Sequence, residues 1–101
     1  MNNIPEKYLP LGTVVLLKNG RHRAMIVGYG IKLDGDPNNR FYDYMGSLFP
    51  EGIFTSEQSL AFDHSDIDKI FYMGYKDKET EEFMKKLKEL MKNLEDGGKN
   101  G

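Results

Sequence analysis

The amino-acid sequence predicts an α+β fold: a small, bent antiparallel β-sheet or SH3-like barrel of about five strands, followed by one C-terminal amphipathic α-helix. Short β-branched and aromatic runs bounded by glycine occupy residues 12–75, as is typical of strands joined by tight corners. Over residues 78–95 the apolar residues instead recur at helical spacing. Since 101 residues leave room for one modest core, we expect a single domain over residues 1–96 and a flexible tail over residues 97–101.

The first two strands are predicted as a hairpin. Residues 14–17 (VVLL) and 24–27 (AMIV) flank Asn19 and Gly20, which tolerate the positive φ angles of hairpin turns. A strict two-residue loop would place Lys18 opposite Arg21, so we expect a longer loop. Both strands are apolar at every position rather than alternating, so we expect the helix to cover their second face.

The middle of the chain predicts three further strands. Residues 34–39 (DGDPNN) form a polar loop, and residues 40–45 read as a third strand that ends at the following glycine. A weaker fourth strand is expected near residues 59–62. Ser65 then caps a single turn, which leads into a strand over residues 70–73.

The helix is the clearest element of the sequence. Asp77 is placed to cap its first turn, and the glycine pair at residues 97–98 is expected to end it. Its apolar stripe comprises Phe83, Met84, Leu87, Leu90, Met91 and Leu94. This stripe is too short for a self-sufficient coiled coil, so it must pack against its own sheet, a partner helix, or a second copy of the chain in a homodimer.

The composition argues against several classes of protein. A formal net charge of −2 gives no basic excess, so we expect no nucleic-acid partner, and Lys18, Arg21 and Arg23 are interpreted as a solvated hairpin tip. The absence of cysteine excludes disulfides and thiolate metal sites. The longest apolar run, residues 14–17, is far too short to span a bilayer. We therefore expect a cytoplasmic protein with no membrane partner.

Two patterns could indicate chemistry. Asp34, Asp36 and Asn38 alternate as in the first half of an EF-hand loop, but the glycine and glutamate that such a loop requires are missing, which favours a plain turn. His64 and Asp66 could belong to a small hydrolase or ligand-binding barrel, yet no nucleophile motif accompanies them. We therefore predict a non-enzymatic protein with no catalytic residue, no metal and no cofactor.

The stretch FYDYMGSLFPEG, residues 41–52, is the densest aromatic segment. Strand alternation places Tyr42 and Tyr44 on one face and Asp43 on the other, so something must cover the face of Asp43. The predicted partner-binding residues are Tyr42, Asp43, Tyr44, Phe49, Glu51, Leu87, Met91 and Leu94.

The order of these blocks resembles a known family. The blocks are YLPLGTVVLL (residues 8–17), MIVG (25–28), YDY (42–44), FPEG (49–52), FDHSDI (62–67) and FYMGY (71–75). Over residues 7–92 the chain resembles a family of small Gram-positive proteins known as domain of unknown function number four-one-seven-six. Members are often encoded near type VII secretion genes and LXG-type toxins, and no catalytic residues are established for the family.

The resemblance implies a protein partner, such as a helical LXG-type secretion substrate or toxin. We accordingly expect an accessory protein, adaptor or chaperone for type VII secretion substrates. An immunity protein that binds a cognate toxin is the alternative. Such an inhibitor would present acids to a basic active site, here Asp43, Glu51, Asp63 and Asp66.

Overall fold

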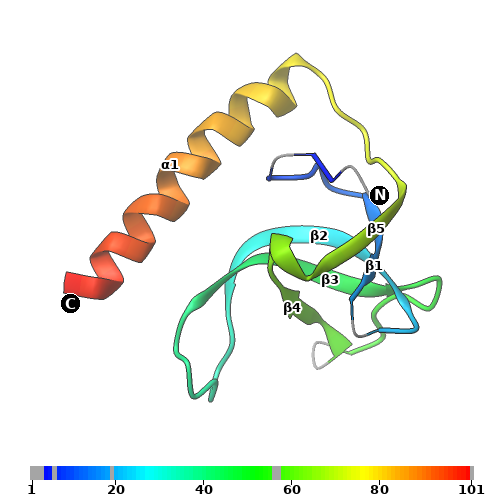
Figure 1. The fold of residues 1–101 in the computed structure, drawn as a ribbon, viewed down its shortest axis with the longest axis horizontal. Coiled ribbons are helices and arrows are strands. Elements are labelled where there is room, and N and C mark those ends of the chain that lie inside the picture. The colour runs from blue at the N-terminus through cyan, green and yellow to red at the C-terminus, as the bar shows by residue number, and fades with distance from the viewer. Residues whose placement is uncertain (1–3, 6, 19, 56–57, 101) are drawn as a thin grey trace.

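The structure is a computed structural model that describes residues 4–5, 7–18, 20–55 and 58–100, with side chains up to residue 94. Its elements, in chain order, are β1 (Val14–Leu17), β2 (Arg23–Lys32), β3 (Phe41–Phe49), β4 (Leu60–Phe62), a 3-10 turn (His64–Asp66), β5 (Ile67–Tyr72) and α1 (Lys78–Asn100) (Figure 1). Among the described residues, no helix has both the length and the apolar character needed to cross a bilayer.

The five strands form one antiparallel sheet in the order β4-β3-β2-β1-β5. The sheet is strongly curved but not closed, with β4 and β5 at its edges. A register shift between Ile26 and Gly28 interrupts the pairing of β2 with β3, and such bulges increase the local bend of a strand. The prediction of an α+β fold with about five strands and one C-terminal helix is confirmed, as an open sheet rather than a closed barrel.

The β1–β2 hairpin has a long loop, as predicted from the repulsion that a two-residue turn would create between Lys18 and Arg21. Pairing ends at Leu16 opposite Arg23, and the Gly20 N–H donates to the Leu17 carbonyl at 3.0 Å inside the loop. Asn19, the other half of the predicted turn, lies outside the described residues. The hairpin tip is therefore wider than a two-residue turn.

Strand β3 continues to Phe49, although the sequence predicted an end at residue 45. Gly46 is buried, and a Cβ atom there would lie 2.7 Å from the ring of Phe62 on the neighbouring strand β4. The glycine thus admits a close ring contact within the sheet rather than ending the strand.

The turn before β5 also differs from its prediction. It begins after Asp63 rather than at Ser65, because the Asp66 carboxylate accepts the Asp63 N–H at 2.9 Å. Strand β5 follows at once from Ile67, three residues earlier than expected.

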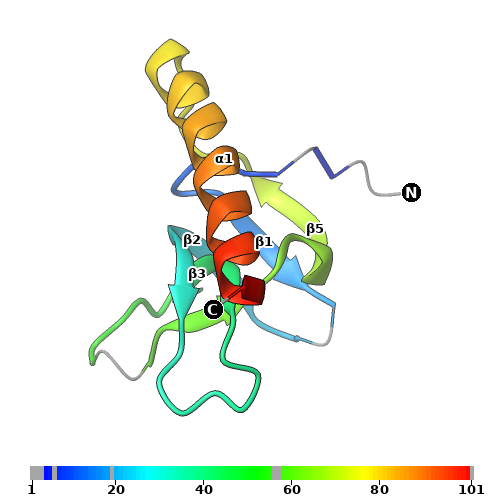
Figure 2. The ribbon, with the colours of Figure 1, turned by 90° about the vertical axis from the view of Figure 1, so that its left-hand side faces the viewer.

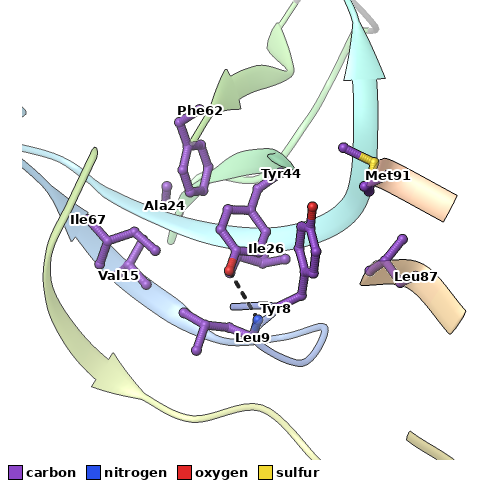
Figure 3. Close-up of a cluster of buried hydrophobic side chains, with 10 residues drawn as sticks. All are labelled: Tyr8, Leu9, Val15, Ala24, Ile26, Tyr44, Phe62, Ile67, Leu87 and Met91. Atoms are coloured by element: carbon purple, nitrogen blue, oxygen red, sulfur yellow. Dashed lines mark hydrogen bonds between the residues drawn. The ribbon is translucent and has the colours of Figure 1, made fainter. Parts of the chain in front are cut away.

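The core lies inside the curve of the sheet, where Tyr44 is fully buried (Figure 3). The N-terminal segment contributes Tyr8 and Leu9 to this core, although no strand or helix was predicted there. The cluster comprises Tyr8, Leu9, Val15, Ala24, Ile26, Tyr44, Phe62, Ile67, Leu87 and Met91.

The helix packs against its own domain. Leu87 and Met91 are only 5% and 3% exposed and join the core cluster. Gly30, at a φ of +65°, leaves room for this contact, because a Cβ there would lie 2.9 Å from the Met91 sulfur. The helix therefore covers the core face of the sheet. The sequence analysis expected it to cover the second face of the first two strands, but Val27 on that face stays exposed.

Helix α1 begins at Lys78 as predicted, with the Asp77 carboxylate accepting the Thr80 N–H at 2.9 Å. It continues to Asn100, past the glycine pair at residues 97–98. Glycine inside a helix lowers the stability of that helix, but it ends the helix only where its backbone adopts the left-handed conformation. Figures 1 and 2 show the first turns of α1 extending beyond the strands.

A tight junction sets the path from β5 to the helix. Gly74 is buried, and a side chain there would collide with the Leu11 carbonyl oxygen. Its N–H donates to the buried Thr13 hydroxyl at 3.0 Å, and that hydroxyl donates to the Pro10 carbonyl at 2.7 Å. Leu11 and the residues after Gly74 therefore lie side by side.

Candidate functional site

The carboxylate of Asp43 is buried in a polar network within the chain. One oxygen accepts hydrogen bonds from Lys7 Nζ and from the Tyr8 hydroxyl, each at 3.3 Å. The other oxygen accepts the backbone N–H of His64 at 2.9 Å. The face of Asp43 is thus covered by the N-terminal segment and the 3-10 turn, so this carboxylate joins distant parts of the chain.

Both ring nitrogens of His64 are also engaged. Nε2 lies 2.8 Å from the Pro5 carbonyl, which can accept but not donate, so Nε2 carries the proton. In the neutral ring, Nδ1 then accepts from the Tyr44 hydroxyl at 2.8 Å. The same hydroxyl accepts the Leu9 N–H at 3.1 Å, the dashed line in Figure 3. Asp66 bonds the backbone of its own turn, so the structure gives these two candidate catalytic residues different partners.

Three tyrosines form the centre of this region. The ring centroids of Tyr8, Tyr29 and Tyr44 lie 5.8 to 5.9 Å from one another. Burial raises the pKa of Tyr29 to about 12 and also raises the pKa of Tyr44. Tyr29 donates its hydroxyl hydrogen to the Leu9 carbonyl. Tyr29 and Tyr44 therefore stay neutral at physiological pH and tie the N-terminal segment to the sheet.

Asp63 is held by an arginine. Arg40 donates to both oxygens of Asp63, at 3.3 and 2.7 Å, and the Asp43 N–H donates to one of them at 3.1 Å. Burial alone would raise the pKa of Asp63, but these hydrogen bonds outweigh it and hold the pKa below its usual value. Three of the four acids considered for toxin binding, Asp43, Asp63 and Asp66, therefore accept hydrogen bonds within the chain.

The polar loop before β3 is organised as a turn. Asp36 accepts the Asn38 N–H at 3.1 Å and the Tyr42 hydroxyl at 3.0 Å. Arg40 stacks on the Tyr42 ring, 4.0 Å from its centroid. Across the described part of the chain, no group of three or more histidine, aspartate or glutamate side chains could hold a metal ion.

The structure places the eight predicted partner-binding residues in different environments. Four of them are buried inside the domain, where they contact other parts of the same chain and cannot reach a partner in this conformation. Asp43, Tyr44, Leu87 and Met91 are buried, Tyr42, Phe49 and Leu94 are half-buried, and Glu51 is exposed. As partner contacts all eight stay predictions.

A solvent-facing groove, which we call the apolar groove, lies between the first turns of α1 and residues Leu11 and Tyr29. It has a volume of about 470 Å³. Its lining residues are Leu11, Tyr29, Tyr75, Asp77, Glu79, Thr80, Phe83 and Met84. Leu11, Tyr75 and Phe83 are 53%, 77% and 49% exposed, so much of this apolar lining faces water.

The apolar groove continues along the helix and has an acidic rim. Leu90 lies seven residues after Phe83, about 10 Å further along the same side of the helix, and is 54% exposed. The charged lining residues are Asp77 and Glu79, and hydrogen bonds from Thr80 lower the pKa of Asp77. Asp77 is therefore ionised at neutral pH.

Part of the apolar groove was predicted from the sequence, whereas its contributions from outside the helix were not. The helical stripe included Phe83 and Leu90, but periodicity could not show which side of a wide stripe is buried. Leu11 and Tyr75 carry no periodic signal, because each lies at a junction between elements. The buried Gly74 brings them together through its contact with the Leu11 backbone.

Together these features define a small α+β domain with an open, curved sheet, a helix docked in cis and an exposed apolar groove. Residues 8–83 match the family described as a domain of unknown function, DUF4176, and the chain belongs to that family. The match confirms the resemblance seen in the sequence blocks. No curated protein and no solved structure matches the chain.

Proposed function

We propose that this chain is a non-enzymatic protein-interaction module that serves type VII secretion substrates as an accessory protein, adaptor or chaperone in the cytoplasm. The observation that carries the proposal is the apolar groove with its three exposed apolar residues, Leu11, Tyr75 and Phe83. Contiguous apolar surface rimmed by polar groups is characteristic of protein-binding sites.

The shape of this surface favours a helical partner. The groove follows the first turns of α1, and Leu90 extends its apolar character by two further turns. An amphipathic helix laid along α1 could place side chains at i, i+3, i+4 and i+7 against this strip. A helical LXG-type substrate would supply such a helix.

The acidic rim of the apolar groove favours a positively charged partner helix. Asp77 and Glu79 stand beside the apolar lining, so a lysine or arginine next to the apolar side of the incoming helix would find an opposite charge. The partner expected at the apolar groove is therefore a basic amphipathic helix.

Copurification tests the proposal. Phe83→Asp, in tagged protein coexpressed with an LXG-type substrate, should abolish copurification, because it places a charge in the groove next to two acids. Phe54→Asp is the matched control, since Phe54 is 82% exposed and does not line the groove. Circular dichroism should show the same helix content in both variants. Copurification that survives Phe83→Asp would contradict the proposal.

The choice of Phe83 follows from the burial of the helix stripe. A charge at Leu87 would disrupt the core, so loss of binding there could not be separated from loss of the fold. A shift to monomer on Phe83→Asp without any partner would instead identify the apolar groove as a homodimer contact.

The immunity alternative makes a different prediction. Of its four proposed acids, Glu51 and Asp66 are exposed. Rescue of toxin-poisoned cells by this protein alone, lost on Glu51→Lys and retained on Phe83→Asp, would favour immunity over the adaptor role.

A further inference from the structure

A second groove lies on the other flank of the buried stripe of α1, between the helix and the N-terminal segment. We call it the basic groove; its volume is about 350 Å³. It is lined by Pro5, Lys7, Tyr8, Pro10, Lys76, Thr80, Glu81, Met84, Lys85 and Lys88. Four lysines and one glutamate form its charged lining, in a chain whose net charge is −2.

The lining of the basic groove combines lysines with apolar residues. Lys85 and Lys88 come from successive turns of α1, whereas Lys7 reaches the groove from the N-terminal segment. Between them lie Pro10 and Met84, which are buried and half-buried. Cationic side chains from two separate segments therefore converge over apolar surface.

The basic groove keeps an excess of positive charge, because its four lysines face one glutamate in the lining and the buried Asp43. Lys7 Nζ contacts Asp43 at 3.3 Å, but that carboxylate also accepts the Tyr8 hydroxyl and the His64 N–H. An ammonium group has three donors, so Lys7 can bind a second carboxylate while it keeps the first.

Lys85, on the helix, is also available to a partner. Helical spacing would pair Glu81 with Lys85, but the Glu81 carboxylate instead lies 3.9 Å from Lys76. That pair is more than half exposed on both sides and contributes little stability. The ion pairs found among the described residues do not include Lys85.

We infer that the basic groove binds an acidic polypeptide segment in which an apolar side chain is flanked by aspartates or glutamates. The apolar side chain would rest on the half-buried Met84, and its acidic neighbours would meet the lysines of the lining. This goes beyond the proposed function, because it concerns an adjoining groove that shares Thr80 and Met84 with the apolar groove but has the opposite charge preference. Nucleic acid fits less well, since Tyr8, the aromatic ring in this lining, is buried and cannot stack on a base.

Fluorescence polarisation tests the inference directly. The probe is a labelled peptide of glutamates around a single leucine, compared with the same peptide carrying lysines and with a labelled oligouridine RNA. The full chain should bind the acidic peptide, and affinity should fall as salt is raised. Lys85→Glu should weaken binding about tenfold or more, because it puts a like charge inside the groove.

Lys86→Glu is the matched control. Lys86 is exposed, does not line the basic groove, and has a glutamate four residues before it, as Lys85 does. It should leave affinity for the acidic peptide nearly unchanged, and so should Phe83→Asp in the apolar groove. Equal losses from Lys85→Glu and Lys86→Glu would reduce the effect to diffuse charge and overturn the inference.

Two further outcomes would also overturn it. The acidic peptide could fail to bind at low salt, or the RNA could bind more tightly than the acidic peptide and reveal a nucleic-acid surface. Because Phe83→Asp tests the apolar groove and Lys85→Glu the basic groove, failure of one proposal is distinguishable from failure of the other.

Discussion

Two aromatic regions of this domain differ in where their rings lie and in what their polar atoms bind. Beneath the N-terminal segment, the hydroxyls of Tyr29 and Tyr44 are bonded within the chain, and the rings pack against one another. In the apolar groove, Tyr75 and Phe83 leave much of their surface to solvent. From the densest aromatic stretch of the sequence, Tyr44 therefore joins the interior, whereas Tyr75 after β5 and Phe83 on α1 contribute to the candidate binding surface.

The contrast shows what marks a recognition surface in a small domain. A buried polar group needs an internal partner, and in the described residues every buried side-chain nitrogen or oxygen has one. Asp43 and His64 looked chemically promising in sequence, and both have their bonding capacity occupied within the chain. Apolar side chains need no hydrogen-bond partner, so the exposed rings of the apolar groove remain available to another protein.

The largest expected effect comes from the junction at Gly74, which brings Leu11 and Tyr75 of the apolar groove together. Gly74→Ala should lower the free energy of unfolding by at least about 3 kcal/mol, because the new methyl group collides with the Leu11 backbone rather than with a movable side chain. Denaturant unfolding followed by circular dichroism measures the loss. Gly20→Ala is the control, since its Cβ would have ordinary contacts at 3.6 Å. Similar stability of the two variants would contradict this account of the junction.

A smaller effect separates the interior aromatic region from exposed rings. Tyr44→Phe keeps the ring but leaves the Leu9 N–H and His64 Nδ1 without their shared partner, which should cost about 1–2 kcal/mol. Tyr72→Phe removes the same hydroxyl from a side chain that is 65% exposed and should change stability by less than about 0.5 kcal/mol. The comparison needs only chemical unfolding of both variants. Equal losses would remove the distinction between the two environments.

The smallest expected effect is the pH dependence of the Arg40–Asp63 pair at the margin of the interior region. The pKa of Asp63 is lower in the folded state than in the unfolded chain. Its contribution to stability is therefore fully present above the unfolded pKa of about 4 and is lost as the pH falls through the folded value. The pair is partly exposed, so the contribution should be below about 1 kcal/mol.

Carbon NMR of the Asp63 carboxyl group against pH checks this assignment. Arg40→Gln removes the charged hydrogen-bond donor and should raise the pKa of Asp63. An unchanged midpoint in that variant would show that Arg40 does not set the ionisation of Asp63.

Local chemistry explains which predictions from sequence were confirmed. The cap at Asp77, the start of α1 and the β1–β2 hairpin depend on neighbours within a few residues, and such patterns are visible in a single sequence. The extension of β3 was missed because Gly46 looked like a strand end. Its role depends on Phe62, which belongs to another strand.

The sequence by itself determined the fold class, the positions of the hairpin and the helix, and the family, because periodicity, caps and block order are written along the chain. The tertiary structure decided which residues are accessible. Lys7 and Asp43 are 36 positions apart, and Tyr44 and His64 are 20 apart, so no local pattern could pair them. Burial depends on long-range packing, and packing encloses Asp43 and Tyr44 while it leaves Phe83 and Lys85 at the surface.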